Sequence, residues 1–198
     1  MSRIVETALV GSSGRPDRFP EPSFPEVAFA GRSNVGKSSL LNKLSARRNL
    51  FKVSRTPGRT RTVVHVEARF DSGARLYLVD LPGFGYARVS HEARESWART
   101  IETYLLERET LHLVVVLVDA RRGPQEEEAE LFDFLANAGR PALLAATKLD
   151  RVKKSRRASA IRRLGDRAGV PVIGTSAVTG QGMDRLLLEI VSRCAPGG

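Results

Sequence analysis

A short stretch near the start of the chain combines glycines with a lysine and serines, as phosphate-binding loops do. It fits the pattern G-x-x-x-x-G-K-[ST] and reads Gly31-Arg32-Ser33-Asn34-Val35-Gly36-Lys37-Ser38. The glycines allow backbone N–H groups to face phosphate oxygens without an intervening Cβ atom. Lys37 can reach the β- and γ-phosphates of a nucleotide, and the Ser38 hydroxyl can ligate Mg²⁺. The pattern therefore predicts a nucleoside triphosphate site.

A second candidate is the aspartate that ends the apolar run RLYLVD. Asp80 precedes Leu81-Pro82-Gly83, which completes the pattern D-x-x-G. A carboxylate at this position can orient a water on Mg²⁺ or hold the metal itself, and the Gly83 N–H can approach a γ-phosphate. An aspartate at a strand end is often only a turn former or a helix cap. Its place after a phosphate loop favours the role in binding.

A third group of residues could recognise a guanine base. The segment Thr147-Lys148-Leu149-Asp150 follows one apolar run, and Thr175-Ser176-Ala177 follows the next. The Asp150 carboxylate could accept two hydrogen bonds, from the N1–H and the 2-amino group of guanine. Adenine offers neither donor, so a site built this way discriminates strongly between the bases. Lys148 can lay its stem over the base, and backbone N–H groups of 175–177 can close over it.

The elements that must position these residues alternate along the chain. Apolar or alternating runs predict strands at 26–31, 63–70, 74–80, 111–120, 141–148 and 170–177. Helical spacing predicts helices at 37–50, 91–108, 125–139, 155–169 and 182–194. Continuous apolar strands indicate a sheet covered on both faces. We therefore predict an α/β fold with a doubly wound, mostly parallel six-stranded sheet and one antiparallel strand, at the Asp71–Gly73 hairpin.

Composition limits the class of protein. The 198 residues suit one domain, which we place at 26–194, after an irregular lead-in at 1–25 and before a frayed tail at 195–198. The only cysteine is Cys194, and no run is long and apolar enough to span a membrane, so we expect a soluble cytoplasmic protein. The net charge of +10 favours a polyanionic partner such as nucleic acid.

The motifs together resemble those of a known family. G-x-x-x-x-G-K-S, D-x-P-G, T-K-x-D and S-A, in this order, are similar to the GTPase superfamily that includes TrmE, Era, EngA, EngB and septins. The strings AGRSNVGKSSLLN, TPGRTRT, DLPGFGYA, TKLD and SWARTIETYL resemble the EngB (YihA/YsxC-type) bacterial GTPases. The resemblance implies a monomeric cytoplasmic GTPase that binds GTP and GDP, uses Mg²⁺, assists assembly of the large (50S) ribosomal subunit on its rRNA and is needed for cell division and septation.

The resemblance also implies roles for a polar, basic loop. Switch I would comprise Gly58-Arg59-Thr60-Arg61-Thr62. Thr60 would ligate Mg²⁺, and Thr62 is a second candidate for the same ligand. The groups assigned to catalysis are Lys37, Thr60 and Gly83. Thr147 stands where many GTPases place asparagine, and we expect it to weaken the bracing of the guanine site.

The expected hydrolysis is slow, because Phe84 occupies the position where many GTPases have a water-orienting glutamine. Additional positive charge could come from a K⁺ ion at Asn34, which resembles the K⁺-liganding asparagine of related GTPases. It could also come from Arg59 or Arg61, although a simple exposed-loop role for these arginines is favoured.

Basic residues gather in two segments, and we interpret them as an rRNA-binding surface rather than merely solvated faces. One segment comprises Arg47, Arg48, Lys52, Arg55, Arg59 and Arg61, and the other Arg151, Lys153, Lys154, Arg156, Arg157, Arg162, Arg163 and Arg167. Two further functions remain open. One is a nucleotide-gated RNA-binding module in which hydrolysis is incidental. The other is an ATP-using P-loop kinase, which Asp150 disfavours.

Overall fold

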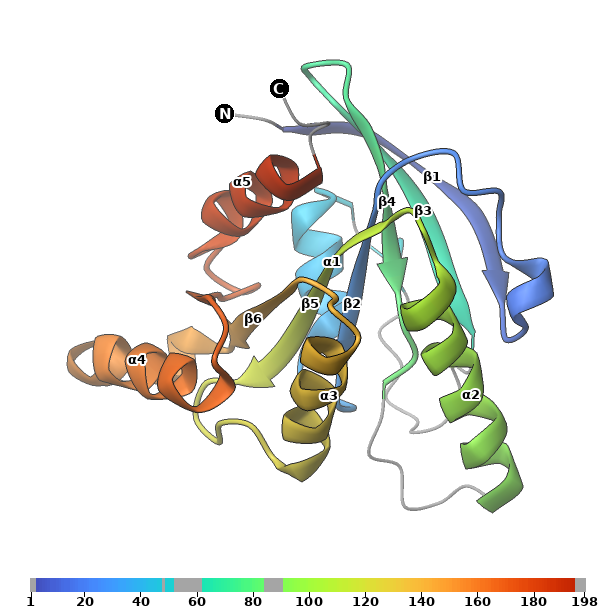
Figure 1. The fold of residues 1–198 in the computed structure, drawn as a ribbon. Coiled ribbons are helices and arrows are strands. Elements are labelled where there is room, and N and C mark those ends of the chain that lie inside the picture. The colour runs from blue at the N-terminus through green and yellow to red at the C-terminus, as the bar shows by residue number, and fades with distance from the viewer. Residues whose placement is uncertain (1–2, 48, 52–61, 84–90, 195–198) are drawn as a thin grey trace.

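One mixed sheet organises the molecule (Figure 1). The computed structural model describes residues 3–47, 49–51, 62–83 and 91–194, with only the backbone for 91–97. Among these residues the sheet has seven strands in the order β1-β3-β4-β2-β5-β6-β7. They are β1 (Ile4–Ser13), β2 (Glu26–Gly31), β3 (Val63–Phe70), β4 (Arg75–Asp80), β5 (Leu111–Asp119), β6 (Ala142–Thr147) and β7 (Val172–Gly174).

Helices cover both faces of this sheet. They are α1 (Lys37–Leu44), α2 (His91–Glu107), α3 (Glu126–Asn137), α4 (Arg157–Ala168) and α5 (Met183–Cys194), with short 3-10 turns η1 (Pro16–Arg18), η2 (Leu149–Arg151) and η3 (Lys154–Arg156). Helices α1 and α5 share one hydrophobic core, and α2, α3 and α4 share the other. No helix of the described residues is both long and apolar enough to cross a membrane.

Strand β5 shows why the central strands read as continuous apolar runs. Leu113, Val115 and Leu117 point into the core under α1 and α5. The alternating residues Val114 and Val116 point into the core under α2, α3 and α4. Both sides of the strand are therefore buried, as in other parallel sheets covered by helices on two faces. The predicted α/β class and mostly parallel sheet are confirmed.

The predicted hairpin is also present. Strands β3 and β4 pair antiparallel, and Gly73 has the positive φ of 85° that favours glycine in the turn between them. The Gly73 N–H donates to the Phe70 carbonyl at 3.0 Å. Strand β3 is thus the strand that runs against the direction of its neighbours.

The segment before β2 differs from the prediction. Residues 1–25 were expected to be an irregular lead-in, but Ile4–Ser13 form strand β1, which pairs antiparallel with β3 and makes the sheet seven-stranded rather than six-stranded. The sequence pattern hides this strand because it lies at the edge of the sheet and buries only Ile4 among its ten residues. Two irregularities in its register, at Ile4/Glu6 and at Leu9/Gly11, further disturb the alternation. The predicted tail at 195–198 lies outside the described residues.

Candidate nucleotide-binding site

The predicted phosphate loop joins the end of β2 to the start of α1. Gly31 lies in a tight space, because a Cβ atom there would lie 3.0 Å from the Leu117 carbonyl oxygen and 3.0 Å from Val35 Cγ1, so these neighbours would have to shift to accommodate a larger residue. Gly36 adopts a left-handed φ of 107°, and Asn34 one of 63°. The first helical hydrogen bond follows directly, from Leu40 N–H to the Gly36 carbonyl at 2.9 Å. The loop therefore turns sharply into the positive end of a helix, which suits phosphate.

The D-x-x-G segment lies against this loop. A Cβ atom at Gly83 would be 3.3 Å from the Gly31 carbonyl oxygen and 3.4 Å from the Ser33 nitrogen. Leu81 and Pro82 are buried, and the Leu81 N–H donates to Phe29 of β2 at 3.1 Å. Ser33 Oγ is buried and has no hydrogen-bond partner among the described residues. The segment that should sense the γ-phosphate is thus held within contact distance of the loop.

Lys37 and Asp80 meet between these two segments. The Lys37 ammonium donates to a carboxylate oxygen of Asp80, and the two side chains are only 11% and 9% exposed. Burial raises the pKa of the Asp80 carboxyl, and the nearby Lys37 ammonium opposes that rise. Ser38 lies in the same helical turn as Lys37 and is half-buried. One cation, one carboxylate and one hydroxyl are therefore concentrated at the start of α1.

Thr147 connects the predicted guanine loop to the phosphate loop. Its buried hydroxyl donates to the Val35 carbonyl at 2.7 Å, and the Val118 carbonyl oxygen lies 3.2 Å away. We expected a threonine here to weaken the bracing of the site. The hydroxyl itself makes a buried bond between the two loops, and the weaker bracing relative to asparagine stays a prediction.

Lys148 crosses over the phosphate loop. Its backbone is left-handed, with φ of 57°, and its ammonium donates to the Asn34 carbonyl at 2.7 Å. Its Cε would lie 3.8 Å from a Cβ atom at Gly36. The lysine stem is thus stretched along the site, where it can cover the face of a base.

Asp119, at the end of β5, is a site residue that the motif analysis missed. Its carboxylate lies 3.2 Å from the Lys148 ammonium and accepts two side-chain hydrogen bonds from Arg121, at 3.0 and 2.7 Å. Burial alone would raise the pKa of Asp119, but the hydrogen bonds from Arg121 and Lys148 hold it well below its ordinary value. The one signal in the sequence was its position at the end of an apolar strand, beside the strand that carries Thr147.

Asp150 and the last strand complete the predicted guanine wall. Ser176 Oγ donates to Asp150 Oδ1 at 2.6 Å. The Leu149 N–H donates to the Thr175 carbonyl at 3.0 Å, and the Thr175 N–H to the Ala146 carbonyl at 2.7 Å. Ala177 follows at the half-buried edge of the same turn. These bonds leave the second carboxylate oxygen of Asp150 available to a ligand.

The structure therefore brings together the residues predicted at four strand ends, those of β2, β4, β6 and β7. Of predicted switch I, Gly58, Arg59, Thr60 and Arg61 lie outside the described residues, as does Phe84. Thr62 is described, and its hydroxyl accepts a hydrogen bond from Ser12 of β1 at 2.7 Å.

The donor set of the site fits Mg²⁺ together with a nucleotide. Among the described residues, no group of three or more His, Cys, Asp or Glu side chains converges on one point. Mg²⁺ in nucleotide sites is held by few protein oxygens and takes its other ligands from water and phosphates. The Ser38 hydroxyl, next to Lys37 in the chain, and the Asp80 carboxylate, paired with Lys37, are oxygens of the kind that such a site uses. The fold and the site together are those of a P-loop GTPase.

Comparison with known proteins specifies the family. The family of 50S ribosome-binding GTPases matches residues 26–148. A probable GTP-binding protein EngB of Solibacter usitatus is 44% identical over 190 residues, 95% of this chain and 96% of the relative. Another, of Desulfatibacillum aliphaticivorans, is 43% identical over 195 residues, 96% and 93% of the two chains. A crystal structure of a probable GTP-binding protein engB has a TM-score of 0.68 at 26% identity and covers 85% and 98% of the chains. This chain belongs to the EngB family of GTP-binding proteins and is a GTPase.

Proposed function

We propose that this GTPase is a GTP-timed assembly factor of the large ribosomal subunit. The observation that carries the proposal is the convergence of the Lys37–Asp80 pair and the Asp150–Ser176 pair at one edge of the sheet, in a chain that matches the 50S ribosome-binding GTPase family. The first pair suits phosphates and Mg²⁺, and the second suits guanine. A cytoplasmic location and a requirement in cell division and septation belong to the same proposal and rest on the family resemblance.

The nucleotide would lie across the site from the phosphate loop to Asp150. Residues 31–38 would surround the phosphates, with the Lys37 ammonium leaving Asp80 for the β- and γ-phosphates. Gly83 would offer its N–H to the γ-phosphate. Thr147–Asp150 and Thr175–Ala177 would hold the guanine, with Lys148 over its face. GTP and GDP share all of these contacts except those of the γ-phosphate.

Mg²⁺ would be held by the Ser38 hydroxyl, by Asp80 through a water, and by a threonine of switch I. We propose Thr60 rather than Thr62 for that threonine. The Thr62 hydroxyl is already hydrogen-bonded to Ser12 of strand β1, so its recruitment to the metal would first break a contact that holds the start of β3. When bound, Mg²⁺ neutralises phosphate charge during hydrolysis.

The hydrolysis would be slow without a partner, because Phe84 cannot orient the attacking water. A K⁺ ion could supply the missing positive charge at Asn34, whose side chain is exposed and whose carbonyl is held by Lys148. Arg59 or Arg61 could do so instead. Rates in KCl and NaCl at equal ionic strength separate these alternatives, since K⁺ dependence that disappears in Asn34→Ala requires the ion.

Co-sedimentation with large ribosomal subunits and their precursors tests the proposed function. We expect binding with a non-hydrolysable GTP analogue at physiological salt and release with GDP. Binding in no nucleotide state would contradict the ribosomal role and leave a GTPase with another partner.

A nucleotide-gated RNA-binding module is the second candidate, and Phe84 favours it because it suggests that turnover is not essential. The discriminating measurement is release from the ribosomal subunit after GTP is added. If the protein leaves the subunit at the rate at which it hydrolyses GTP, it is a switch. If it leaves when its nucleotide is exchanged, without hydrolysis, it is the RNA-binding module.

A further inference from the structure

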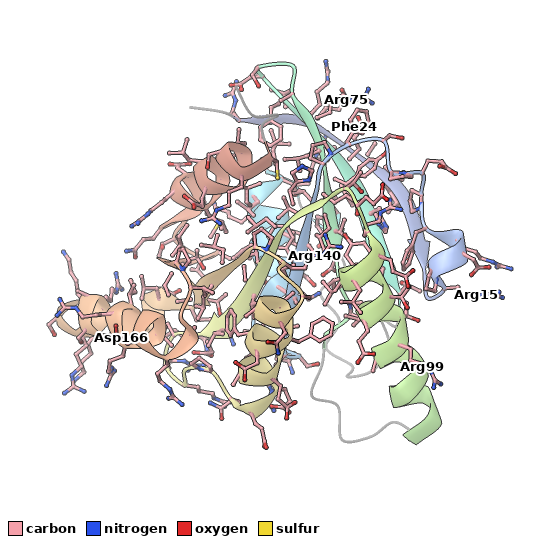
Figure 2. The ribbon with its side chains drawn as sticks, viewed as in Figure 1. Arg15, Phe24, Arg75, Arg99, Arg140 and Asp166 are labelled. Atoms are coloured by element: carbon pink, nitrogen blue, oxygen red, sulfur yellow. The ribbon has the colours of Figure 1, made fainter. Side chains whose placement is uncertain are left out.

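One surface of the molecule carries an unusual density of positive charge. Helix α4 and the η2 and η3 turns before it span residues 149–168. Their exposed cations are Arg151, Lys153, Lys154, Arg156, Arg162, Arg163 and Arg167, which we name the α4 basic face. The one acidic residue between 151 and 169 is Asp166. Figure 2 shows the nitrogen-tipped side chains that extend from this helix around the labelled Asp166.

These cations differ from arginines elsewhere on the surface. Arg69 pairs with Glu6, Arg75 with Glu67, and Arg193 with Glu189, at 2.6 to 2.7 Å. None of the seven cations of the α4 basic face makes an ion pair with a carboxylate of the described residues. The repulsion among them is therefore left uncompensated within this part of the chain, and an anionic partner would relieve it.

The helical register aligns three of the arginines. Ala160 and Leu164 are buried against the sheet, and Arg162 and Asp166 lie on the opposite side of α4. Arg156 caps the start of α4, and Arg163 and Arg167 follow at spacings of seven and four residues. The three arginines therefore lie along one flank of the helix, beside its buried side, over about 16 Å. Arg167 Nη1 lies 3.8 Å from where a Cβ atom of Gly123 would be. The row therefore approaches the loop that contains Arg121 and Arg122.

The chemistry of this row points to RNA phosphates. Arginine matches phosphate geometry with two parallel hydrogen bonds, and most of the face is arginine. Residues 151–169 contain no Phe, Tyr or Trp on which an unpaired base could stack. None of the large exposed apolar side chains of the described residues lies there either, so the face lacks the anchors of a protein or membrane interface. Contacts to phosphates and shape are how proteins recognise double-stranded RNA.

The face is attached directly to the guanine loop. Arg157, the first residue of α4, donates to the Val152 carbonyl at 3.0 Å, to Gln181 Oε1 at 3.0 Å and to the Asp150 carbonyl at 3.4 Å. These bonds fix the start of α4 against the turn that carries Asp150. The helix that carries the row of arginines is thereby held in place before any partner binds, which reduces the cost of ordering the backbone on binding.

We propose that the α4 basic face is a docking surface for the phosphate backbone of double-stranded RNA. This inference deepens the proposed function, on which it rests for the identity of the RNA as ribosomal. The row Arg156–Arg163–Arg167 makes the central contacts. Lys153, Lys154 and Arg122 extend the surface on either side. Arg157 positions the face and makes no contact with RNA.

The test compares two triple variants of the full chain that remove the same charge. The first is Arg156→Gln with Arg163→Gln and Arg167→Gln. The control is Arg18→Gln with Arg99→Gln and Arg185→Gln, three exposed arginines of η1, α2 and α5. Fluorescence anisotropy measures the affinity of each for a labelled RNA hairpin of about 20 base pairs, with a non-hydrolysable GTP analogue and Mg²⁺ present. Unchanged binding of a fluorescent GDP derivative verifies that both variants fold.

We expect the α4 triple variant to bind the hairpin about tenfold more weakly than the unmodified protein or worse. The control triple variant should bind it about as tightly as the unmodified protein. The slope of log affinity against log salt should fall by about 2 to 3 in the α4 triple, because three phosphate contacts are lost. Four outcomes would each overturn the proposal. The α4 triple could lose no affinity, or both triples could lose affinity equally. The unmodified protein could fail to bind the hairpin, or it could bind an unpaired RNA of the same length equally tightly.

Pelleting of the same proteins with large ribosomal subunits separates this inference from the proposed function. If the unmodified protein pellets while the hairpin experiment fails, the ribosomal role stands and the α4 basic face is not its RNA contact. If the hairpin experiment succeeds but the protein pellets in no nucleotide state, the face binds RNA and the ribosomal role is wrong.

Discussion

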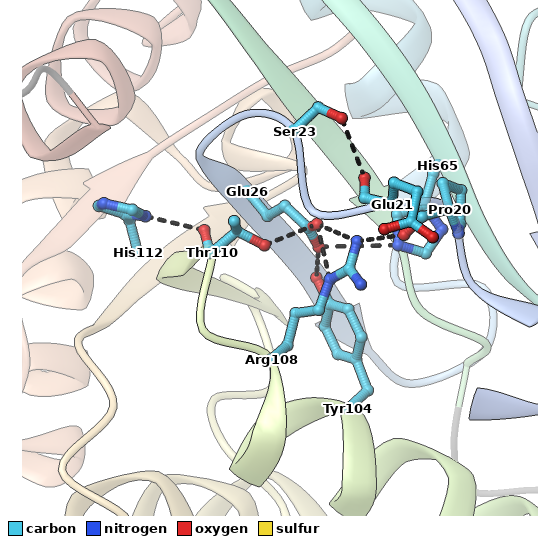
Figure 3. Close-up of polar contacts among 9 residues, drawn as sticks. All are labelled: Pro20, Glu21, Ser23, Glu26, His65, Tyr104, Arg108, Thr110 and His112. Carbon is cyan, nitrogen blue, oxygen red and sulfur yellow. Dashed lines mark hydrogen bonds and ion pairs between the residues drawn. The ribbon is translucent and has the colours of Figure 1, made fainter. Parts of the chain in front are cut away.

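Strand β2 carries polar groups at both of its ends, and the two ends treat them in opposite ways. At its amino end, the fully buried Glu26 carboxylate accepts hydrogen bonds from Tyr104 at 2.7 Å, Arg108 at 2.8 Å and Thr110 at 2.9 Å (Figure 3). His65 Nε2 lies 3.6 Å from the same carboxylate. At its carboxyl end, by contrast, the buried Asp80 carboxyl has Lys37 as its one side-chain partner among the described residues.

The amino end is a closed structural cluster. Arg108 also donates to the Pro20 carbonyl at 2.7 Å, and the rings of Phe19 and Tyr104 lie 5.6 and 6.0 Å from that of His65. Burial alone would raise the pKa of Glu26, but the neighbouring His65 ring and the hydrogen bonds from Arg108 and Tyr104 lower it to about 2. The cluster therefore joins α2, β2, β3 and the segment before β2 without needing a ligand.

The carboxyl end is built to be completed by a ligand. Its Asp80 carboxyl pairs with Lys37 alone among the described residues, and burial raises the pKa of Asp80 against that contact. Phosphates and Mg²⁺ would supply the missing partners. The Glu26 carboxylate has three hydrogen-bond donors and serves stability, whereas the Asp80 carboxyl has Lys37 alone among the described residues and suits a ligand. Both ends also hold buried polar atoms without a hydrogen-bond partner in this part of the chain, the His65 ring nitrogens at one end and Ser33 Oγ at the other. Substitutions at the two ends should accordingly separate affinity from stability.

The largest expected effect is on affinity, at the guanine wall. In Asp150→Ala the base loses a carboxylate that would accept two charge-assisted hydrogen bonds, so GDP should bind about 10³-fold more weakly, or about 4 kcal/mol. Asp150 is only partly buried, and we expect the free energy of unfolding to change by less than about 1 kcal/mol. Titration calorimetry with GDP and urea unfolding without nucleotide measure the two quantities.

The matched control is Asp166→Ala, an exposed aspartate on α4. It should alter neither the affinity for GDP nor the stability. A loss of stability in Asp150→Ala as large as its loss of affinity would contradict the separation of the two roles.

At the other end of β2 the effects should be reversed. Glu26→Gln removes the charge that pairs with Arg108 while keeping the shape of the side chain. The lowered pKa of Glu26, about 2 against 4.5, corresponds to about 3 kcal/mol of stability at neutral pH. We expect a loss of this order in urea unfolding and a melting temperature roughly 6–12 °C lower. GDP affinity should change by less than about twofold, since Glu26 lies one strand length from the phosphate loop; a tenfold loss would show that the ends are coupled.

The pH dependence of stability gives an independent test of the same cluster. A carboxyl with a lowered pKa in the folded state contributes its full stability above the unfolded value of 4.5, and loses it as the pH falls towards about 2. Across this pH window the free energy of unfolding of the unmodified protein should therefore fall by about 3 kcal/mol because of Glu26. The other titrating groups add a further change that the Glu26→Gln variant shares. Chemical unfolding between pH 2 and 6 measures both proteins. Parallel curves for the two would contradict the assignment.

The residues at the carboxyl end of β2 could be predicted from the sequence better than those at its amino end, for a physical reason. The phosphate loop is a local pattern, because Gly31 and Gly36 shape a continuous stretch of backbone next to Lys37. The guanine residues also follow strand ends, and the parallel sheet brings them together. In contrast, Glu26 finds Tyr104 and Arg108 only through tertiary contacts across about 80 residues, and no spacing rule predicts such pairs.

Two other features could not be predicted, for related reasons. Strand β1 is stabilised by backbone pairing at an edge, and its mostly exposed side chains carry no periodic signal. Asp119 looked like an ordinary strand end, because its partners Arg121 and Lys148 identify its role only once β5 and β6 are adjacent.

Asp119 shares features with both ends of β2, because it is partnered within the protein and also lies beside the proposed nucleotide site. Its carboxylate is fully partnered by Arg121 and Lys148, as Glu26 is by its own cluster, yet one of those partners lies over the phosphate loop. Asp119→Asn should therefore lower both quantities modestly, with a loss of about 1 kcal/mol in stability and about fivefold in GDP affinity. Calorimetry and urea unfolding measure these effects, and the exposed Asp133→Asn on α3 is the control.

A second variant separates the two contributions of Asp119. Arg121→Gln removes the structural partner but leaves the contact with Lys148, so it should reproduce the loss of stability with little loss of affinity. Because the pKa of Asp119 is held below its ordinary value, the stability difference between Asp119→Asn and the unmodified protein should persist above that value and shrink as the pH falls below it. Unchanged GDP affinity in Asp119→Asn would place this residue with Glu26, as a structural charge that lies beside the site without supporting it.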